Sequence, residues 1–155
     1  MENVREKVDE LLLNMDDSSL WRSGYIHLYG ISQASAMIAM KREENVELAA
    51  IAGMLHDIYT YTAKDSQNHA QHSSVMAKEI LESLKLFTAG EIHLICTAVY
   101  HHSNKEKIHS AFGEVLIDGD ILQHCLYSPL FQVIDYEKER YEKLKAEFQL
   151  NLYNI

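Results

Sequence analysis

Apolar residues recur every three or four positions along most of this sequence, a spacing that places them on one face of successive α-helices. The chain has one proline and six glycines, so few residues interrupt helices, and segments of alternating polarity that would indicate strands are hard to find. Its 155 residues suffice for one domain with a buried core. The sequence therefore predicts a compact all-α bundle of about six to eight helices.

Capping and turn residues predict where the first helices begin and end. The polar run 16–19 ends a first helix, and a second helix extends from about residue 20 to residue 42. Asn45 caps a third helix. Thr88 and Glu91 have the spacing of a capping box and begin a later helix.

The remaining segments are predicted from the same signals. Residues 59–65 are expected to form a loop, and the next helix is expected to begin at Asp65 or Ser66. A further helix is expected to end near residues 128–129, a Ser-Pro pair. Residues 130–155 are predicted to form an amphipathic helix that covers the core or a partner subunit, as in a homodimer.

Charge and composition limit the classes of partner. The formal charge of −9 is poorly suited to binding nucleic-acid backbones, which require clustered Lys and Arg. No run approaches the roughly 20 apolar residues of a membrane span, and the first residues are charged rather than apolar. Cys96 and Cys125 belong to no close cysteine pair and are typical of a reducing compartment. The sequence predicts a cytoplasmic protein without nucleic-acid or membrane partners.

Histidine and aspartate side chains form the candidate functional site. His56 and Asp57 stand together after the small, apolar segment 49–55, whose small side chains let neighbouring helices approach closely. An anion in the last helical turn opposes the macrodipole, which makes Asp57 an unusual choice unless a cation is nearby. His27 lies on an inward face of its helix, and Asp120 lies on a face expected to be buried, where an unpaired carboxylate would be costly. The pattern indicates a metal site between helices.

This order of residues resembles the HD superfamily of metal-dependent phosphohydrolases, in which a helical His precedes a His-Asp doublet and a distant Asp follows. The resemblance covers roughly residues 22–126 of a single HD domain expected to span 1–155, and Gly119 stands where the family usually has Ala. It implies that one divalent ion is held by four residues and that the doublet is catalytic. The four residues are His27, His56, Asp57 and Asp120.

Additional histidines match branches of the family that hold a second metal ion. The diadenosine tetraphosphate hydrolase branch looks closest, and its extra positions correspond here to His72 and to the pair His101 and His102. His102 shares a face with Ile95, Ala98 and Val99 and is therefore preferred to His101. His124, one turn after Asp120, is a candidate neighbour of the site, whereas His69, one turn before His72, is expected to be peripheral. The resemblance implies a binuclear centre, and a mononuclear centre remains the alternative.

The predicted function is hydrolysis of a phosphate ester or nucleotide by a metal-activated hydroxide. Mixed nitrogen and oxygen ligands suit Fe, Mn, Co, Ni or Zn better than Mg or Ca. Lys64 is a candidate contact for the phosphate of a small phosphorylated substrate. Two alternatives remain open: a mixed-valent di-iron oxygenase of the same superfamily, and a non-catalytic module that binds a metal or nucleotide.

Overall fold

The computed structural model describes residues 1–127 and 132–150, and every regular element in these two ranges is a helix. The prediction of an all-α fold is confirmed. In chain order the elements are α1 (Glu2–Leu13), α2 (Ser18–Lys41), α3 (Val46–Leu55), α4 (Ile58–Ala63), α5 (His69–Leu84), α6 (Ala89–His101), α7 (Ala111–Tyr127), η1 (Asp135–Glu137) and α8 (Lys138–Glu147). The helix end predicted at residues 128–129 lies outside the described residues, as do 130–131 and 151–155 of the predicted C-terminal helix.

The predicted caps form as expected. The side chain of Asn45 accepts a hydrogen bond of 3.0 Å from the backbone N–H of Leu48 and begins α3. Thr88 and Glu91 form the reciprocal capping box at the start of α6. These local bonds explain why the starts of both helices could be predicted from the sequence.

The predicted loop at residues 59–65 is wrong, because most of this segment forms α4. Ile58 is buried, and the hydroxyl of Thr62 donates to the carbonyl of Ile58, 2.8 Å away, within this short helix. The following helix does not begin at Asp65 or Ser66 either. The carboxylate of Asp65 accepts from the backbone N–H of Gln67, 2.8 Å away, and this turn delays the start of α5 to His69.

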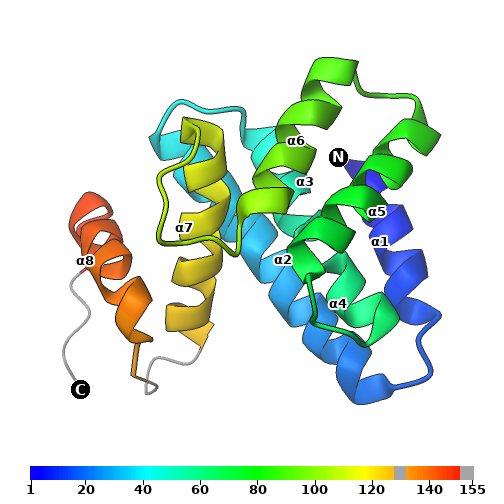
Figure 1. Ribbon diagram of the computed structural model, residues 1–155, viewed down its shortest axis with the longest axis horizontal. Helices are drawn as coiled ribbons and strands as arrows, with labels where there is room; N and C mark the ends of the chain where they lie inside the picture. The colour runs from blue at the N-terminus through cyan, green and yellow to red at the C-terminus, as the bar shows by residue number, and fades with distance from the viewer. Residues whose placement is uncertain (128–131, 151–155) are drawn as a thin grey trace.

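α2 runs through the middle of the molecule and packs against both α3 and α7 (Figure 1). The contact with α3 is close because Gly53 faces the backbone of α2: a Cβ added there would lie 2.7 Å from the Cα atom of Ser32. Gly119 of α7 faces Ser35 of α2 in a similar way. These two glycines let α3 and α7 bring their functional side chains close to those of α2.

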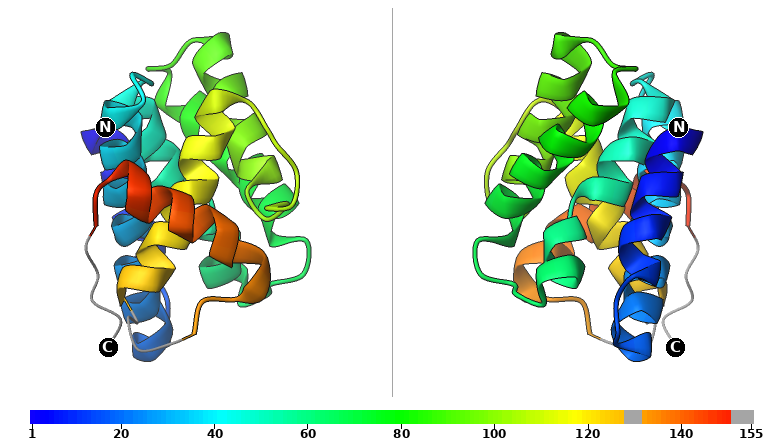
Figure 2. Two further views of the ribbon diagram at one scale, coloured as in Figure 1. Left: turned by 90° about the vertical axis from the view of Figure 1, so that its left-hand side faces the viewer. Right: turned by 90° about the vertical axis from the view of Figure 1, so that its right-hand side faces the viewer.

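The C-terminal elements cover the outer side of α7 (Figure 2). The helix predicted over 130–155 is shorter in the described residues, where η1 and α8 occupy only 135–147. Tyr141 and Leu144 of α8 are buried in the core, so α8 covers its own chain. Ion pairs tie α8 to earlier helices, and they include Arg42 with Glu147 at 2.7 Å. Across both described ranges, no helix has the length and apolarity that crossing a lipid bilayer requires.

Candidate metal centre

Asp57 lies between two pairs of histidines, and each of its oxygens faces one pair. Oδ2 is 3.4 Å from Nε2 of His27 and 3.6 Å from Nε2 of His56. Oδ1 is 3.5 Å from Nε2 of His69 and 3.3 Å from Nε2 of His102. Two ligand atoms that bind one tetrahedral ion at about 2.1 Å lie about 3.4 Å apart. The spacing therefore suits two cations that share the Asp57 carboxylate.

A second carboxylate, Asp120, lies on the other side of His27. Its Oδ1 atom is 3.4 Å from Nε2 of His124, and the rings of His124 and His27 stack with their centroids 5.3 Å apart. One ligand atom from each of these three side chains fits within a mutual distance of 4.8 Å. Asp120 can therefore contribute to the same centre as the His56-Asp57 doublet.

The ends of several helices position these side chains. His56 follows the last residue of α3, and Asp57 directly precedes α4. His69 is the first residue of α5, and His102 follows the last residue of α6. His27 is on α2, while α7 supplies the carboxylate of Asp120. The centre therefore joins helices that are distant in the sequence.

Backbone carbonyls fix the orientation of three of the imidazoles. The Nδ1 atom of His56 is 2.8 Å from the carbonyl oxygen of Gly53, and the corresponding distance from His102 to Val99 is 2.7 Å. His69 makes a similar 3.0 Å contact with the carbonyl three residues before it. A carbonyl oxygen only accepts, so Nδ1 donates to it in each case, and Nε2 is the nitrogen that faces Asp57 and could bind a metal.

Three buried polar atoms of the cluster have no hydrogen-bond partner among the described residues: Nε2 of His56, Oδ1 of Asp57 and Oδ1 of Asp120. An unpartnered buried acceptor is costly. All three are nitrogen or oxygen atoms with free lone pairs, which are the donors that a transition metal accepts. The residues present thus fit a divalent metal centre.

The electrostatics of the cluster are also suited to a cation. Burial lowers the pKa of His56 to about 3, so its imidazole is neutral at neutral pH. Burial alone would raise the pKa of Asp57, but the surrounding imidazoles outweigh it and hold that pKa well below its usual range. Burial alone would also raise the pKa of Asp120, but the Lys105 ammonium outweighs burial and holds that pKa below its usual range. Burial lowers the pKa of His102, but the Asp57 carboxylate outweighs burial and raises it. Metal binds neutral imidazoles and ionised carboxylates, so a proton on His102 must leave when an ion enters.

Of the residues predicted from the sequence, the structure brings six together: His27, His56, Asp57, His102, Asp120 and the candidate neighbour His124. It does not bring His72 to them. His72 is exposed and stacks on Tyr59, with 4.5 Å between ring centroids, while His69 occupies the position expected for His72. The physical reason is the phase of α5, whose buried face includes Ser73 and Ala77, so that His69 points inward and His72 points outward.

His101 and Lys64 also lie apart from the cluster. The ring of His101 stacks on His109 with centroids 5.1 Å apart, in agreement with the preference for His102. Lys64 is exposed and ends α4 in the left-handed conformation, with φ of 55°. Its side chain makes no ion pair or hydrogen bond within residues 1–127 and 132–150, so the structure gives no support to a role in phosphate binding.

The amine that does reach the cluster is that of Lys105, which was not predicted from the sequence. Its Nζ atom is 2.7 Å from Oδ2 of Asp120 and 2.5 Å from Oε1 of Glu137. Lys105 lies in a polar loop close to Lys107, and nothing in the sequence distinguishes the two lysines. Tyr61 was missed too: burial, then the charges of Asp57 and Asp120, raise the pKa of its hydroxyl.

Comparison with known proteins agrees with this geometry. The family model of the HD domain matches residues 24–147, so the chain belongs to the HD domain family. A crystal structure of a predicted HD superfamily hydrolase from an uncultured Thermotogales bacterium has 21% sequence identity and a TM-score of 0.63, covering 96% of this chain and 89% of that chain. At this identity the likeness shows a shared fold. No curated protein matches the chain significantly.

Proposed function

We propose that this protein is a metal-dependent phosphohydrolase with a binuclear centre. The observation that carries the proposal is the position of Asp57, whose two oxygens face two separate histidine pairs at 3.3 to 3.6 Å. A carboxylate that bridges two ions is a recurrent feature of two-metal phosphoester hydrolysis. Resemblance to the diadenosine tetraphosphate hydrolase branch supports a nucleotide or another small phosphate ester as the substrate.

Each residue has a defined part in this proposal. His27 and His56 would hold one ion together with Asp57, and His69 and His102 would hold the other. Bound divalent ions would supply an activated water molecule and Lewis-acid polarisation of a phosphoryl oxygen. Asp120 adds a further carboxylate on the side of His27. The donor set favours Fe, Mn, Co, Ni or Zn.

His124 is the partly solvent-exposed member of the cluster. Its side chain is 44% exposed, and Nε2 lies 3.4 Å from Oδ1 of Asp120. An imidazole that contacts both the site and bulk water is placed to relay a proton between them. We assign this role to His124.

We also place the protein in the cytoplasm, because its two cysteines are unpaired, as is typical of a reducing compartment.

A phosphoester panel tests the proposal. Metal-free protein is reloaded with Mn, Co, Fe, Ni, Zn or Ca and assayed on bis-p-nitrophenyl phosphate, nucleoside monophosphates and dinucleoside polyphosphates. Chelation should abolish hydrolysis, and a transition metal should restore it better than Ca because imidazole nitrogen is a poor ligand for Ca. Full activity in excess chelator, after verified loss of metal, would refute the mechanism.

The two alternative functions have distinct outcomes in the same experiment. A di-iron oxygenase would consume oxygen with an organic substrate and would release no phosphate from the panel. A non-catalytic binding module would bind a nucleotide in calorimetry, and no phosphate would appear over hours.

A further inference from the structure

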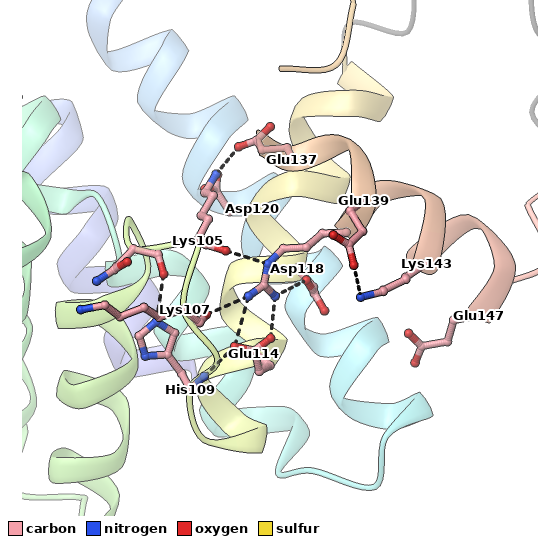
Figure 3. Close-up of polar contacts among 12 residues, drawn as sticks. Lys105, Lys107, His109, Glu114, Asp118, Asp120, Glu137, Glu139, Lys143 and Glu147 are labelled. Carbon is pink, nitrogen blue, oxygen red and sulfur yellow. Dashed lines mark hydrogen bonds and ion pairs between the residues drawn. The ribbon is translucent and has the colours of Figure 1, made fainter. Parts of the chain in front are cut away.

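The Lys105 ammonium lies between two buried carboxylates that come from different elements (Figure 3). Asp120 belongs to α7, and Glu137 is the last residue of η1. The side chains of Lys105, Asp120 and Glu137 are only 9%, 6% and 3% exposed. A buried ammonium is stable only when it is paired, and here it is paired twice.

The two oxygens of Asp120 have different surroundings. Oδ2 accepts from Nζ of Lys105 at 2.7 Å. Oδ1 is turned toward His124 and His27 and has no hydrogen-bond partner in the described chain. Because Lys105 occupies one oxygen, Asp120 presents the other to the candidate metal centre as a single donor atom with a fixed direction.

The C-terminal segment holds Lys105 in this position. Glu137 binds its ammonium, and Arg140 of α8 donates to the backbone carbonyls of Lys105 and Lys107, each 3.0 Å away. An ion pair of 2.5 Å with Glu114 in turn fixes Arg140. Figure 3 shows Glu114 together with Lys105 and Lys107. The loop that carries Lys105 also follows directly after His102, so these contacts support two sides of the centre.

Lys105, Asp120 and Glu137 together carry a net negative charge, which favours a cation nearby. One ammonium faces two carboxylates, so a single negative charge remains. Glu137 belongs to no group of candidate metal ligands among the described residues, whereas Asp120 belongs to one with His27 and His124. The remaining negative charge is therefore available to the histidine cluster through Asp120.

We propose that Lys105 and Glu137 are positioning residues for Asp120, and that the C-terminal segment is therefore a working part of the metal centre although none of its residues is a ligand. This inference rests on the proposed function, because it requires that Asp120 bind metal. Glu137 holds the ammonium of Lys105 in place, and this ammonium in turn orients the carboxylate of Asp120.

Cobalt binding tests the inference without an activity assay. Lys105→Met removes the ammonium and keeps the length of the side chain, and Lys107→Met is the matched control on an exposed lysine of the same loop. Dissociation constants for Co²⁺ are measured by chelator competition, and the visible absorption of bound Co²⁺ reports the number and arrangement of its ligands. Loss of a residue that orients a ligand typically weakens metal binding about 10- to 100-fold.

We expect Lys105→Met to weaken Co²⁺ binding by about 10- to 100-fold and to change the absorption spectrum, because both oxygens of Asp120 become free. Lys107→Met should bind as the wild type does. Glu137→Gln should weaken binding in the same direction, whereas Glu139→Gln, a change on an exposed neighbour paired with Lys143, should not. The double variant Lys105→Met/Glu137→Gln avoids an unpaired buried carboxylate at Glu137 and serves if the single variant fails to fold.

The outcomes separate this inference from the proposed function. If the wild-type chain binds Co²⁺ and the Lys105 variants bind it with unchanged or tighter affinity and the same spectrum, the positioning role is overturned alone. If the wild-type chain binds no Co²⁺, the proposed metal centre is overturned, and the positioning role with it.

Discussion

At the scale of single residues, the centre depends on which histidine of α5 points inward. His69 faces Oδ1 of Asp57 at 3.5 Å, whereas His72 is exposed beside Tyr59. We expect His69→Ala to reduce the metal content from two ions per chain to one, because the ion on Oδ1 loses one of its two imidazoles. His72→Ala is the control and should keep both ions. Elemental analysis of the purified proteins measures this, and the opposite result would reassign the ligand.

The residues that meet at the centre could be predicted only in part, for a physical reason. His56, Asp57 and His27 follow from their order and from the small residues around the doublet. His69 could not be predicted, because the buried face of α5 is lined by small residues such as Ser73 and Ala77, whereas the larger Val75 is exposed. Lys105 could not be predicted either, since its two partners are distant in the sequence.

At the scale of helices, the approach of α3 to α2 sets the distance between His56 and His27. Gly53→Ala would place a Cβ atom 2.7 Å from backbone atoms of Ser32, which cannot move aside as a side chain could. Overpacking of this kind costs about 1 to 3 kcal/mol, more than the roughly 1 kcal/mol that Ala gains over Gly in a helix. We therefore expect lower stability in urea denaturation and weaker metal binding.

Gly90→Ala is the matched control for this substitution. Gly90 is in α6 and exposed, and an added Cβ would meet only the Thr88 hydroxyl, at 4.0 Å. The change should raise stability by about 0.5 to 1 kcal/mol. If Gly53→Ala were as well tolerated as Gly90→Ala, close packing of α2 on α3 would not be what fixes the site.

The attachment of α8 should depend on pH. A hydrogen bond from Arg42 holds the pKa of Glu147 below its ordinary value of 4.5. A carboxyl group with a lowered pKa in the folded state stabilises the fold above its ordinary pKa, and this contribution is lost as the pH falls through the folded-state value. Glu147→Gln should therefore cost about 1 kcal/mol at pH 7, and this cost should shrink progressively as the pH falls below 4.5.

Urea denaturation of both proteins across this range checks the pH dependence. The control is Glu142→Gln, a change of an exposed carboxyl on the same helix that is paired with Lys145 on the surface. A difference between wild type and Glu147→Gln that persists undiminished at pH 3 would show that the ion pair with Arg42 does not attach α8.

At the scale of the whole molecule, the fold was easier to predict than the arrangement of its parts. The helical spacing of apolar residues such as Val4, Val8 and Leu12 predicts an all-α protein, and these three side chains are indeed buried. The short helix α4 escaped prediction because its six residues are too few to show a period, and packing on α5 stabilises it. A helix cap depends on residues a few positions apart, whereas contacts between helices depend on residues that are distant in the sequence.

A centre that joins distant helices should also stabilise the whole protein when it is loaded. A ligand that binds only the folded state at 100 times its dissociation constant adds about 2.7 kcal/mol. For a chain of this size we expect Co²⁺ or Mn²⁺ to raise the melting temperature by about 5 to 10 °C. Differential scanning calorimetry measures the shift. No shift at saturating metal would show that the ion does not bind the folded chain preferentially.

The most direct test of the central claim is the metal content of the Asp57→Ala variant. Both candidate ions depend on this side chain, since its two oxygens face the two histidine pairs. Elemental analysis of the purified wild type and of a folded Asp57→Ala variant, expressed in the same medium, compares their metal per chain. We expect two transition-metal ions in the wild type and none in the variant. Wild-type metal content in the variant would contradict it.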